Sequence, residues 1–235
     1  MRIYKLALTG GIATGKSYAR QRFEELGIPT VDADEIARKL PRRHSEALEA
    51  IVRRFGPAIL NRNGTLNRRA LAAVVFANPD ARHDLEAILH PAVYRAIQAW
   101  FEHLELLGRH RIGLADIPLL YETGRHAGFD KVIVTWCPEE MQMARMLDRG
   151  MTEPEAQQRM AAQLPSAEKK ARADYVIDTS GSKEDTNRQI DAIFDQLVEI
   201  VQPSPPPPSA TPLPATEPEE PEEPKEPKEP EESNE

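Results

Sequence analysis

A glycine-rich segment near the N-terminus, GGIATGKS at residues 10–17, contains the residue types that bind nucleotide phosphates. It matches the pattern G-x-x-x-x-G-K-[ST] and lies between a predicted strand and a predicted helix, which is the context that this motif requires. Glycines let backbone N–H groups turn toward phosphate oxygens, and a helix N-terminus adds partial positive charge. We therefore predict nucleotide binding, with Lys16 at the β- and γ-phosphates and Ser17 at a magnesium ion. The nucleotide-binding residues expected from this motif are Gly11, Ile12, Ala13, Thr14, Gly15, Lys16 and Ser17.

Two aspartates, Asp32 and Asp34, stand between a short strand and a helix that are predicted within residues 28–40. Asp34 is expected at the end of this strand, and in a parallel sheet that end faces the phosphate loop. A carboxylate at Asp34 could then accept the proton of a hydroxyl group that receives a phosphoryl group. Asp32 is a candidate for supporting magnesium or for capping the helix, and capping is also the structural alternative for the pair.

Two arginines, Arg145 and Arg149, lie four residues apart in a helix predicted over residues 138–150. At this spacing they share one face of the helix. Forked guanidinium donors suit phosphate oxygens, so the pair could close over a transferred phosphate. A solvated helix face is the alternative.

Strands alternating with helices must position these residues, and this alternation predicts an α/β fold with a parallel sheet covered on both faces. We expect five parallel strands. Residues 45–107 carry apolar residues at helical spacing throughout, which predicts a helical insertion between strands two and three. His90-Pro91 is expected to separate two helices of this block. A helix over residues 183–201 closes the domain.

Charge and composition limit the possible classes of protein. The net charge is −8, but residues 203–235 contain ten of the 38 acidic residues and two of the 30 basic ones, so residues 1–202 are neutral overall. A neutral domain has no global field for nucleic acid. No apolar run approaches the roughly 20 residues of a membrane span. The single cysteine, Cys137, excludes an intrachain disulfide and fits a reducing cytoplasm. The proline- and glutamate-rich segment 203–235 is predicted to be a disordered acidic tail, either solubilising or able to bind a protein partner.

Several further motifs follow the phosphate loop in order: DADEIAR, GTLNRRALAAVVFANP, LEAILHPAV, DIPLLYETG and AAQLPSAEKKARADYVIDTSG. Together they closely resemble the dephospho-CoA kinase family over residues 3–195. This resemblance implies a P-loop kinase of the nucleoside-monophosphate-kinase type. Its members transfer the γ-phosphate of ATP, with Mg²⁺, to the 3′-hydroxyl of dephospho-CoA. It also implies a core at residues 1–40 and 108–202, a CoA-binding helical insertion at 41–107 and a lid at 138–168.

The resemblance also implies roles for individual residues. It makes Lys16, Asp34 and Arg145 catalytic, with Asp34 as the general base. Arg149 and Gly181 are expected at ATP. Asp116 is a second candidate for the acidic residue near magnesium, although its position in its strand looks too early. Gln142 and Gln163 match family positions without a chemical role. The residues expected to bind the acceptor are Asp34, Arg68, His90, Leu119 and Glu122, with Arg68 and its neighbour Arg69 near a pyrophosphate.

Two departures from the family pattern concern ATP binding. Ala13 stands where glycine is usual, so either this position does not need a positive φ or the strain is tolerated. Thr179 stands where the family usually has asparagine, in a turn that the resemblance places near the adenine of ATP. Which contact position 179 makes with the adenine is therefore open.

Two rival functions remain open. One is another small-molecule kinase of the same fold, and the other is a non-catalytic nucleotide-binding scaffold. A GTPase is disfavoured because the sequence contains no N-K-x-D motif.

Overall fold

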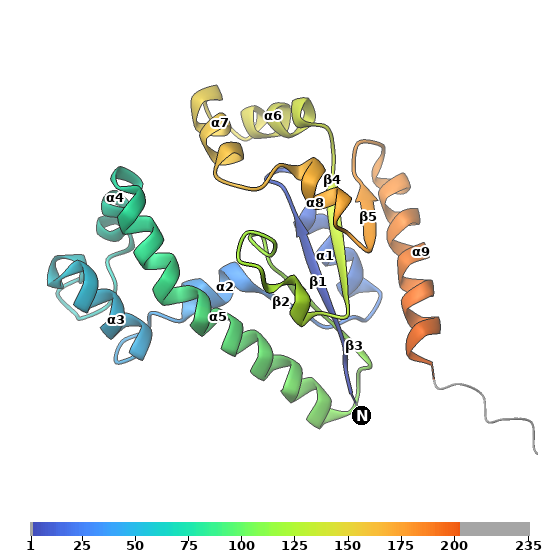
Figure 1. Cartoon of the computed structure of the whole chain (residues 1–235), viewed down its shortest axis with the longest axis horizontal. Helices are drawn as coiled ribbons and strands as arrows, with labels where there is room; N and C mark the ends of the chain where they lie inside the picture. Colours follow the sequence, from blue (N-terminus) through green and yellow to red (C-terminus); the bar gives the residue numbers. More distant parts are fainter. Residues whose placement is uncertain (1, 203–235) are drawn as a thin grey trace, which may run out of the picture. The chain divides into compact units, whose positions relative to one another are not determined.

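Five parallel strands form the central sheet (Figure 1). The computed structural model describes residues 2–202. The strand order is β2-β3-β1-β4-β5, which confirms the predicted five-stranded parallel sheet. The strands are β1 (Tyr4–Gly10), β2 (Thr30–Asp32), β3 (Ile112–Asp116), β4 (Lys131–Trp136) and β5 (Tyr175–Asp178).

Strand β1 lies at the centre of the sheet, between β3 and β4. Leu8 is in register with Asp116 of β3, and Gly10 is in register with Thr135 of β4. The carboxyl ends of all these strands therefore meet at one edge. The chain passes from β1 out to β2 on one side and later to β4 on the other, and open α/β sheets bind ligands where the strand order reverses in this way.

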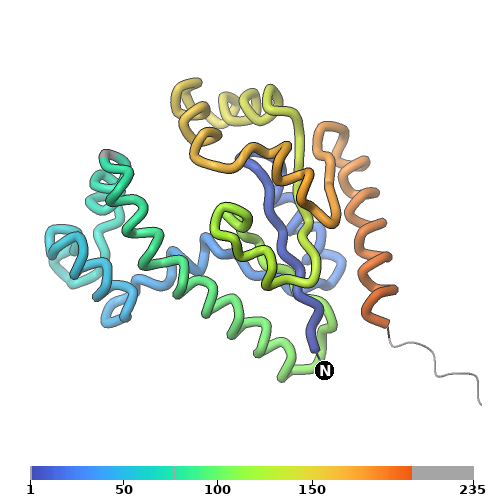
Figure 2. The backbone as a smooth tube through the Cα atoms, viewed as in Figure 1, coloured from blue at the N-terminus to red at the C-terminus, as the bar shows by residue number. Residues whose placement is uncertain are grey.

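Helices cover both faces of the sheet (Figure 2). Alternate residues of β1 point to opposite faces, as the strand geometry requires. Leu6 and Leu8 pack in one cluster with residues of α1 (Lys16–Glu25) and α9 (Lys183–Val201). Ala7 packs in the other cluster with residues of α2 (Ala33–Lys39) and α5 (Pro79–Leu107). The helices are α1 (Lys16–Glu25), α2 (Ala33–Lys39), α3 (Glu46–Phe55), α4 (Arg68–Ala77), α5 (Pro79–Leu107), α6 (Glu139–Asp148), α7 (Glu153–Ala161), α8 (Ser166–Ala171) and α9 (Lys183–Val201), with 3₁₀ turns η1 (Pro57–Ile59) and η2 (Arg125–Gly128).

Between β2 and β3, the helices form a small core of their own. Ile51, Ile59 and Leu71 are buried together, and Leu85 and Leu89 from the first half of α5 pack against them. The second half of α5 packs on the sheet instead. Helix α5 therefore connects the helical block to the sheet.

The prediction of a helix break at His90-Pro91 is wrong, because α5 runs continuously through Pro91 for 29 residues. Proline removes one backbone donor and usually kinks a helix. Here Pro91 is exposed, and the apolar face continues beyond it through Val93 and Ile97, which are buried in the sheet cluster. Tertiary packing on both sides of the proline thus maintains one helix.

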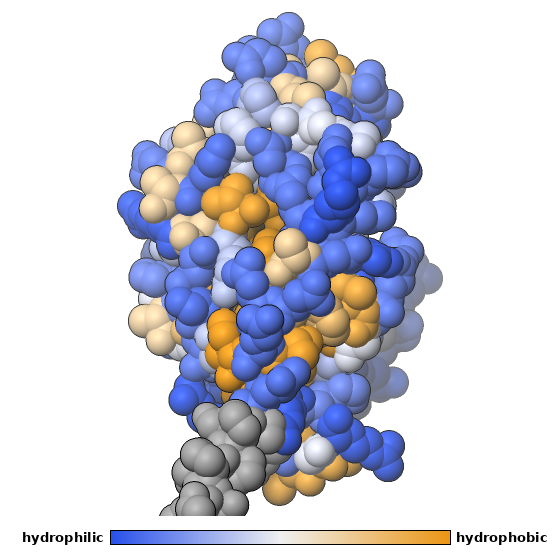
Figure 3. All heavy atoms as spheres, turned by 90° about the vertical axis from the view of Figure 1, so that its right-hand side faces the viewer, coloured by the Kyte–Doolittle hydropathy of each residue, from blue (hydrophilic) through white to orange (hydrophobic). Residues whose placement is uncertain are grey.

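Within residues 2–202, no helix is long and apolar enough to cross a membrane. On the side of the molecule that Figure 3 shows, hydrophilic residues predominate, and hydrophobic residues occur in small groups among them. The predicted acidic tail at residues 203–235 and its predicted protein partner lie outside the described residues.

Candidate active site

The phosphate loop connects the end of β1 to the start of α1, and glycine is required at two of its positions. A Cβ atom on Gly10 would lie 2.3 Å from Thr135 Oγ1, so no side chain fits between β1 and β4 there. Gly15 precedes α1 with φ of 86°, in the left-handed region. Ala13 also has a positive φ, of 59°. Position 13 therefore does adopt the conformation that favours glycine, and alanine is tolerated in it.

Buried hydroxyl groups of Thr14 and Thr135 fix the phosphate loop against β4. Thr14 is 1% exposed, and its Oγ1 donates to the Gly11 carbonyl at 2.8 Å. The hydroxyls of Thr14 and Thr135 also lie 2.8 Å apart. Side chains thus fix the phosphate loop to β4.

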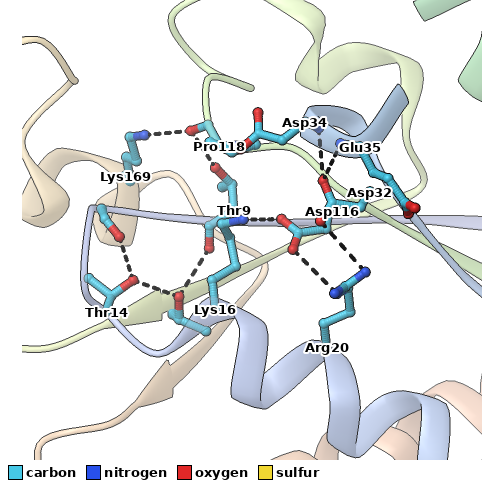
Figure 4. Close-up of polar contacts among 12 residues, drawn as sticks. Thr9, Thr14, Lys16, Arg20, Asp32, Asp34, Glu35, Asp116, Pro118 and Lys169 are labelled. Carbon is cyan, nitrogen blue, oxygen red and sulfur yellow. Dashed lines mark hydrogen bonds and ion pairs between the residues drawn. The ribbon is translucent and has the colours of Figure 1, made fainter. Parts of the chain in front are cut away.

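Lys16 forms an ion pair with Asp116, the last residue of β3 (Figure 4). The expectation that Asp116 lies too early in its strand is therefore wrong, because Asp116 is at the end of β3. Burial raises the pKa of the Asp116 carboxyl, and the Lys16 ammonium opposes that rise. Arg20 extends the network, with 3.7 Å from its Nε to Asp116 Oδ2 and 3.6 Å from its Nη1 to Asp32 Oδ2. Two carboxylates and a lysine are thereby assembled next to the phosphate loop.

The two aspartates of the DAD motif have different positions. Asp32 is the last residue of β2 and caps α2, because its Oδ1 accepts from the backbone N–H groups of Asp34 and Glu35 at 2.8 and 3.1 Å. The prediction that Asp34 lies at the end of the strand is wrong, because Asp34 lies in the first turn of α2. Its side chain extends toward Pro118, in the segment that follows β3 (Figure 4). No residue within 2–202 pairs with its carboxylate. Asp34 is thus exposed and free to meet a ligand.

Arg145 connects the phosphate loop to the turn after β5. Its guanidinium donates to the Ala13 carbonyl at 3.1 Å and to the Thr179 carbonyl at 2.6 Å. Thr179 Oγ1 accepts from Arg145 at 3.1 Å and donates to the Thr14 carbonyl at 2.9 Å. Thr179, which departs from the family pattern, therefore holds the phosphate loop through its hydroxyl group. Arg149 follows the end of α6 and is exposed.

A cleft of about 720 Å³ opens beside the loop, between the sheet edge and the helical block. Ile12 of the loop lines this cleft together with four of the predicted residues: Asp34, His90, Leu119 and Glu122. Arg68 and Arg69 do not line it, and the Arg68 guanidinium instead donates to the Arg38 carbonyl. A smaller, more apolar hollow of about 210 Å³ adjoins the cleft and shares Asp34 and His90 with it.

Three arginines that the sequence did not single out also line the cleft, namely Arg82, Arg125 and Arg159. They come from α5, η2 and α7. One signal for Arg82 was available, because Arg82, Glu86, His90 and Tyr94 follow at intervals of four on one face of α5. The expected helix break at Pro91 concealed that spacing.

Lys169 was also missed. Its side chain is fully buried, and its Nζ lies 2.7 Å from Glu122 Oε1 and 2.9 Å from the Pro118 carbonyl. Glu122 also accepts from the Leu164 backbone N–H at 2.9 Å. Burial lowers the pKa of Lys169, and Glu122 opposes that shift. This pair ties the segment between α7 and α8 to the wall of the cleft.

Across residues 4–185, the chain matches the family model of dephospho-CoA kinase. The chain belongs to the dephospho-CoA kinase family. A dephospho-CoA kinase of Geobacillus kaustophilus (strain HTA426) is 46% identical over 192 residues, which cover 81% of this chain and 95% of that protein. The family resemblance drawn from the motifs is thereby confirmed.

Solved structures agree with this family membership. TT1252 from Thermus thermophilus is 31% identical with a TM-score of 0.71, covering 84% of this chain and 99% of that one. The dephospho-CoA kinase from Campylobacter jejuni is 27% identical with a TM-score of 0.64, covering 83% and 97%. The fold predicted for a kinase of this family is confirmed.

Proposed function

We propose that this chain transfers the γ-phosphate of ATP to the 3′-hydroxyl of dephospho-CoA, giving CoA and ADP. One observation carries the proposal beyond family membership. Ile12 of the phosphate loop and Asp34 line the same cleft, and the Asp34 carboxylate has no partner among the residues that the structure describes. A donor phosphate and an acceptor hydroxyl can therefore meet there.

The phosphates of ATP are bound by the backbone amides of the loop and by Lys16. In this structure Lys16 pairs with Asp116, and we propose that it turns to the β- and γ-phosphates when ATP binds. Arg145 holds the conformation of the phosphate loop through the Ala13 carbonyl. We propose that the neighbouring turn, up to Gly181, contacts the adenine of ATP. Arg149 is then a residue that reaches ATP only if the lid closes.

Transfer needs a proton acceptor at the acceptor hydroxyl. The 3′-oxygen attacks the γ-phosphorus while its proton passes to the Asp34 carboxylate. The bond between the γ-phosphorus and the bridging oxygen breaks, and ADP leaves. Phosphoryl transfer depends mainly on positioning and charge neutralisation, and a general base of this kind contributes about 10²–10⁴-fold.

We propose that the acceptor occupies the cleft between Asp34 and the helical block. His90 and Leu119 would contact the nucleoside, with Glu122 in the cleft wall. Arg82, Arg125 and Arg159 supply forked donors along the cleft, which suit a diphosphate. In this proposal they take the role first expected of Arg68. The insertion at 41–107 is then the acceptor-binding part, and 138–168 the lid.

Magnesium fits the residues present. Within residues 2–202, no cluster of three or more His, Cys, Asp or Glu side chains could enclose a metal. Mg²⁺ does not need such a cluster, because it keeps several waters and takes one or two protein oxygens together with phosphates. The Ser17 hydroxyl and a carboxylate of Asp116 or Asp32 would hold it, and it would neutralise phosphate charge. The cytoplasmic location predicted from the sequence also remains part of this proposal.

The deciding experiment measures ADP release by the purified chain with Mg-ATP and a panel of acceptors. We expect turnover with dephospho-CoA and none with shikimate or nucleoside monophosphates. Turnover only with one of the latter would favour another kinase of this fold. Nucleotide binding without any transfer would favour the scaffold.

A further inference from the structure

Gln163 stands between two clefts of the structure. It follows the end of α7, where its backbone N–H donates to the Met160 carbonyl at 3.1 Å. With Ile12 of the phosphate loop it lines the cleft that contains Asp34. The same two residues also line a second cleft, of about 670 Å³, between the loop and helices α6 and α7. Gln163 therefore lies next to the phosphate loop and also lines the cleft that contains Asp34.

The orientation of the Gln163 amide group is fixed by its partner. The backbone N–H of Ile12 donates to Gln163 Oε1 at 3.0 Å. A backbone N–H can only donate, so the atom facing it must be the carbonyl oxygen, and the NH₂ group must point elsewhere. Within the described part of the chain, this NH₂ group donates to no protein atom.

The neighbouring backbone is also held in place. Leu164 N–H donates to Glu122 Oε1 at 2.9 Å, and Glu122 is held by Lys169. Gln163 is thus anchored at its own side chain and on the residue that follows. A neutral donor held in this way needs little reorganisation when charge develops nearby, which is the condition for strong stabilisation of a transition state.

We propose that Gln163 Nε2 donates a hydrogen bond to the phosphoryl group while it passes from ATP to the acceptor. This inference rests on the proposed kinase function and adds a catalytic residue to it. Gln163 keeps both of its amide protons throughout, so the bonds formed and broken are those of the transfer itself. Its oxygen holds the loop amide of Ile12, and its nitrogen faces the moving phosphate.

Two substitutions separate donation from support of the loop. Gln163→Glu keeps an oxygen for Ile12 N–H but removes the NH₂ donor at neutral pH. Gln163→Ala removes both. We expect both variants to lower kcat by about 10²–10³, the usual effect of removing one such donor. Lowering the pH should raise the kcat of Gln163→Glu relative to wild type, because the protonated carboxyl regains a donor. Gln163→Ala should show no such recovery.

Gln157 provides the matched control, since it is an exposed glutamine of α7 that lines only the second cleft. Gln157→Ala and Gln157→Glu should keep kcat within about twofold of wild type, roughly 0.4 kcal/mol by transition-state arithmetic. A near-normal kcat for Gln163→Glu at neutral pH would show that only the bond to Ile12 matters, and would overturn the proposal. A raised kcat for Gln163→Ala would show that Gln163 blocks a loop amide, with the same consequence.

A binding measurement tests the proposal independently of the acceptor. ADP with aluminium fluoride mimics the phosphoryl group in transfer, so fluoride should tighten ADP binding to wild type. We expect Gln163→Ala to bind ADP normally and to lose most of the tightening by aluminium fluoride. Full tightening in the variant would refute the donor role, even if wild type used a different acceptor. Absence of ADP release with dephospho-CoA by wild type would refute the proposed function alone.

Discussion

Replacing Glu122 with glutamine should destabilise the protein strongly, because it leaves the Lys169 ammonium without its charged partner. The Lys169 side chain has 0% exposure and that of Glu122 has 21%, with 2.7 Å between Nζ and Oε1. After Glu122→Gln, the ammonium would retain the Pro118 carbonyl at 2.9 Å and an amide oxygen. The charge itself would stay buried and unpaired.

The magnitude follows from Coulomb's law and from the desolvation already present. Two unit charges 2.7 Å apart interact by about 6 kcal/mol at an effective dielectric constant of about 20. Part of this is offset because Glu122 no longer has to be desolvated and because glutamine still offers an oxygen. Breaking a buried pair by removing one partner typically costs about 3–5 kcal/mol. We therefore expect a loss of about 3 kcal/mol in the free energy of unfolding, or roughly 6–12 °C in Tm for a domain of this size.

Urea unfolding as a function of pH tests this reasoning. The folded-state pKa of Lys169 is lowered, so between that pKa and about 10.4 the unfolded state binds more protons than the folded state. Stability in that window rises with pH. Removing Glu122 lowers the pKa of Lys169 further, because the charge that opposed the effect of burial is gone, so Glu122→Gln begins to gain stability at a lower pH than wild type. The deficit of Glu122→Gln should therefore shrink as the pH rises toward about 10.

Two further variants complete the test. Adding Lys169→Met to Glu122→Gln should recover most of the loss, because no charge is then buried. Glu168→Gln, on the exposed side of α8, should change stability by less than about 0.5 kcal/mol. A deficit below about 1 kcal/mol for Glu122→Gln, or one that grows with pH, would refute the buried-charge argument.

Four other predictions concern the loop, the base and α5. Lys16→Met should abolish ADP release. It should also lower the free energy of unfolding more at neutral than at mildly acidic pH, because it leaves the Asp116 carboxylate buried without its lysine partner. Equal losses in urea titrations at both pH values would contradict this. Asp34→Asn should lower kcat by about 10²–10⁴ while Tm stays close to wild type, since Asp32 caps α2; unchanged kcat would remove Asp34 as the base. Gly10→Ala should cost about 1–3 kcal/mol in urea unfolding because its Cβ would overlap a side chain of β4. Pro91→Ala should raise stability by about 1–3 kcal/mol by restoring a helix hydrogen bond, and a lower Tm would show that α5 needs its proline.

Much of the candidate site was predictable because its residues occur in short local motifs. The phosphate loop needs glycines, lysine and serine at fixed spacing, and that requirement is visible without any tertiary contact. Asp34 followed from its motif, although its position in the first turn of α2 did not. His90 was identified while the helix around it was misread. Proline is a strong local signal, but the packing of α5 on two separate cores outweighs it.

The residues that were missed depend on contacts between distant segments. Lys169 looks like one of the two lysines of a short helix, and only folding places it in the interior beside Glu122. The amide orientation of Gln163 is set by Ile12, which is 151 residues away in the chain. No local pattern encodes either contact.

The sequence by itself thus determined the family, the parallel sheet and the identity of the phosphate loop, because all three depend on local residue types and on the order of motifs. Only the tertiary structure decided that Lys16 pairs with Asp116, that no residue within 2–202 pairs with the Asp34 carboxylate, and that three arginines line the cleft. The physical reason is that a parallel sheet brings the ends of sequence-distant strands to one edge. Which charges meet there depends on burial and register, and neither can be read from one segment alone.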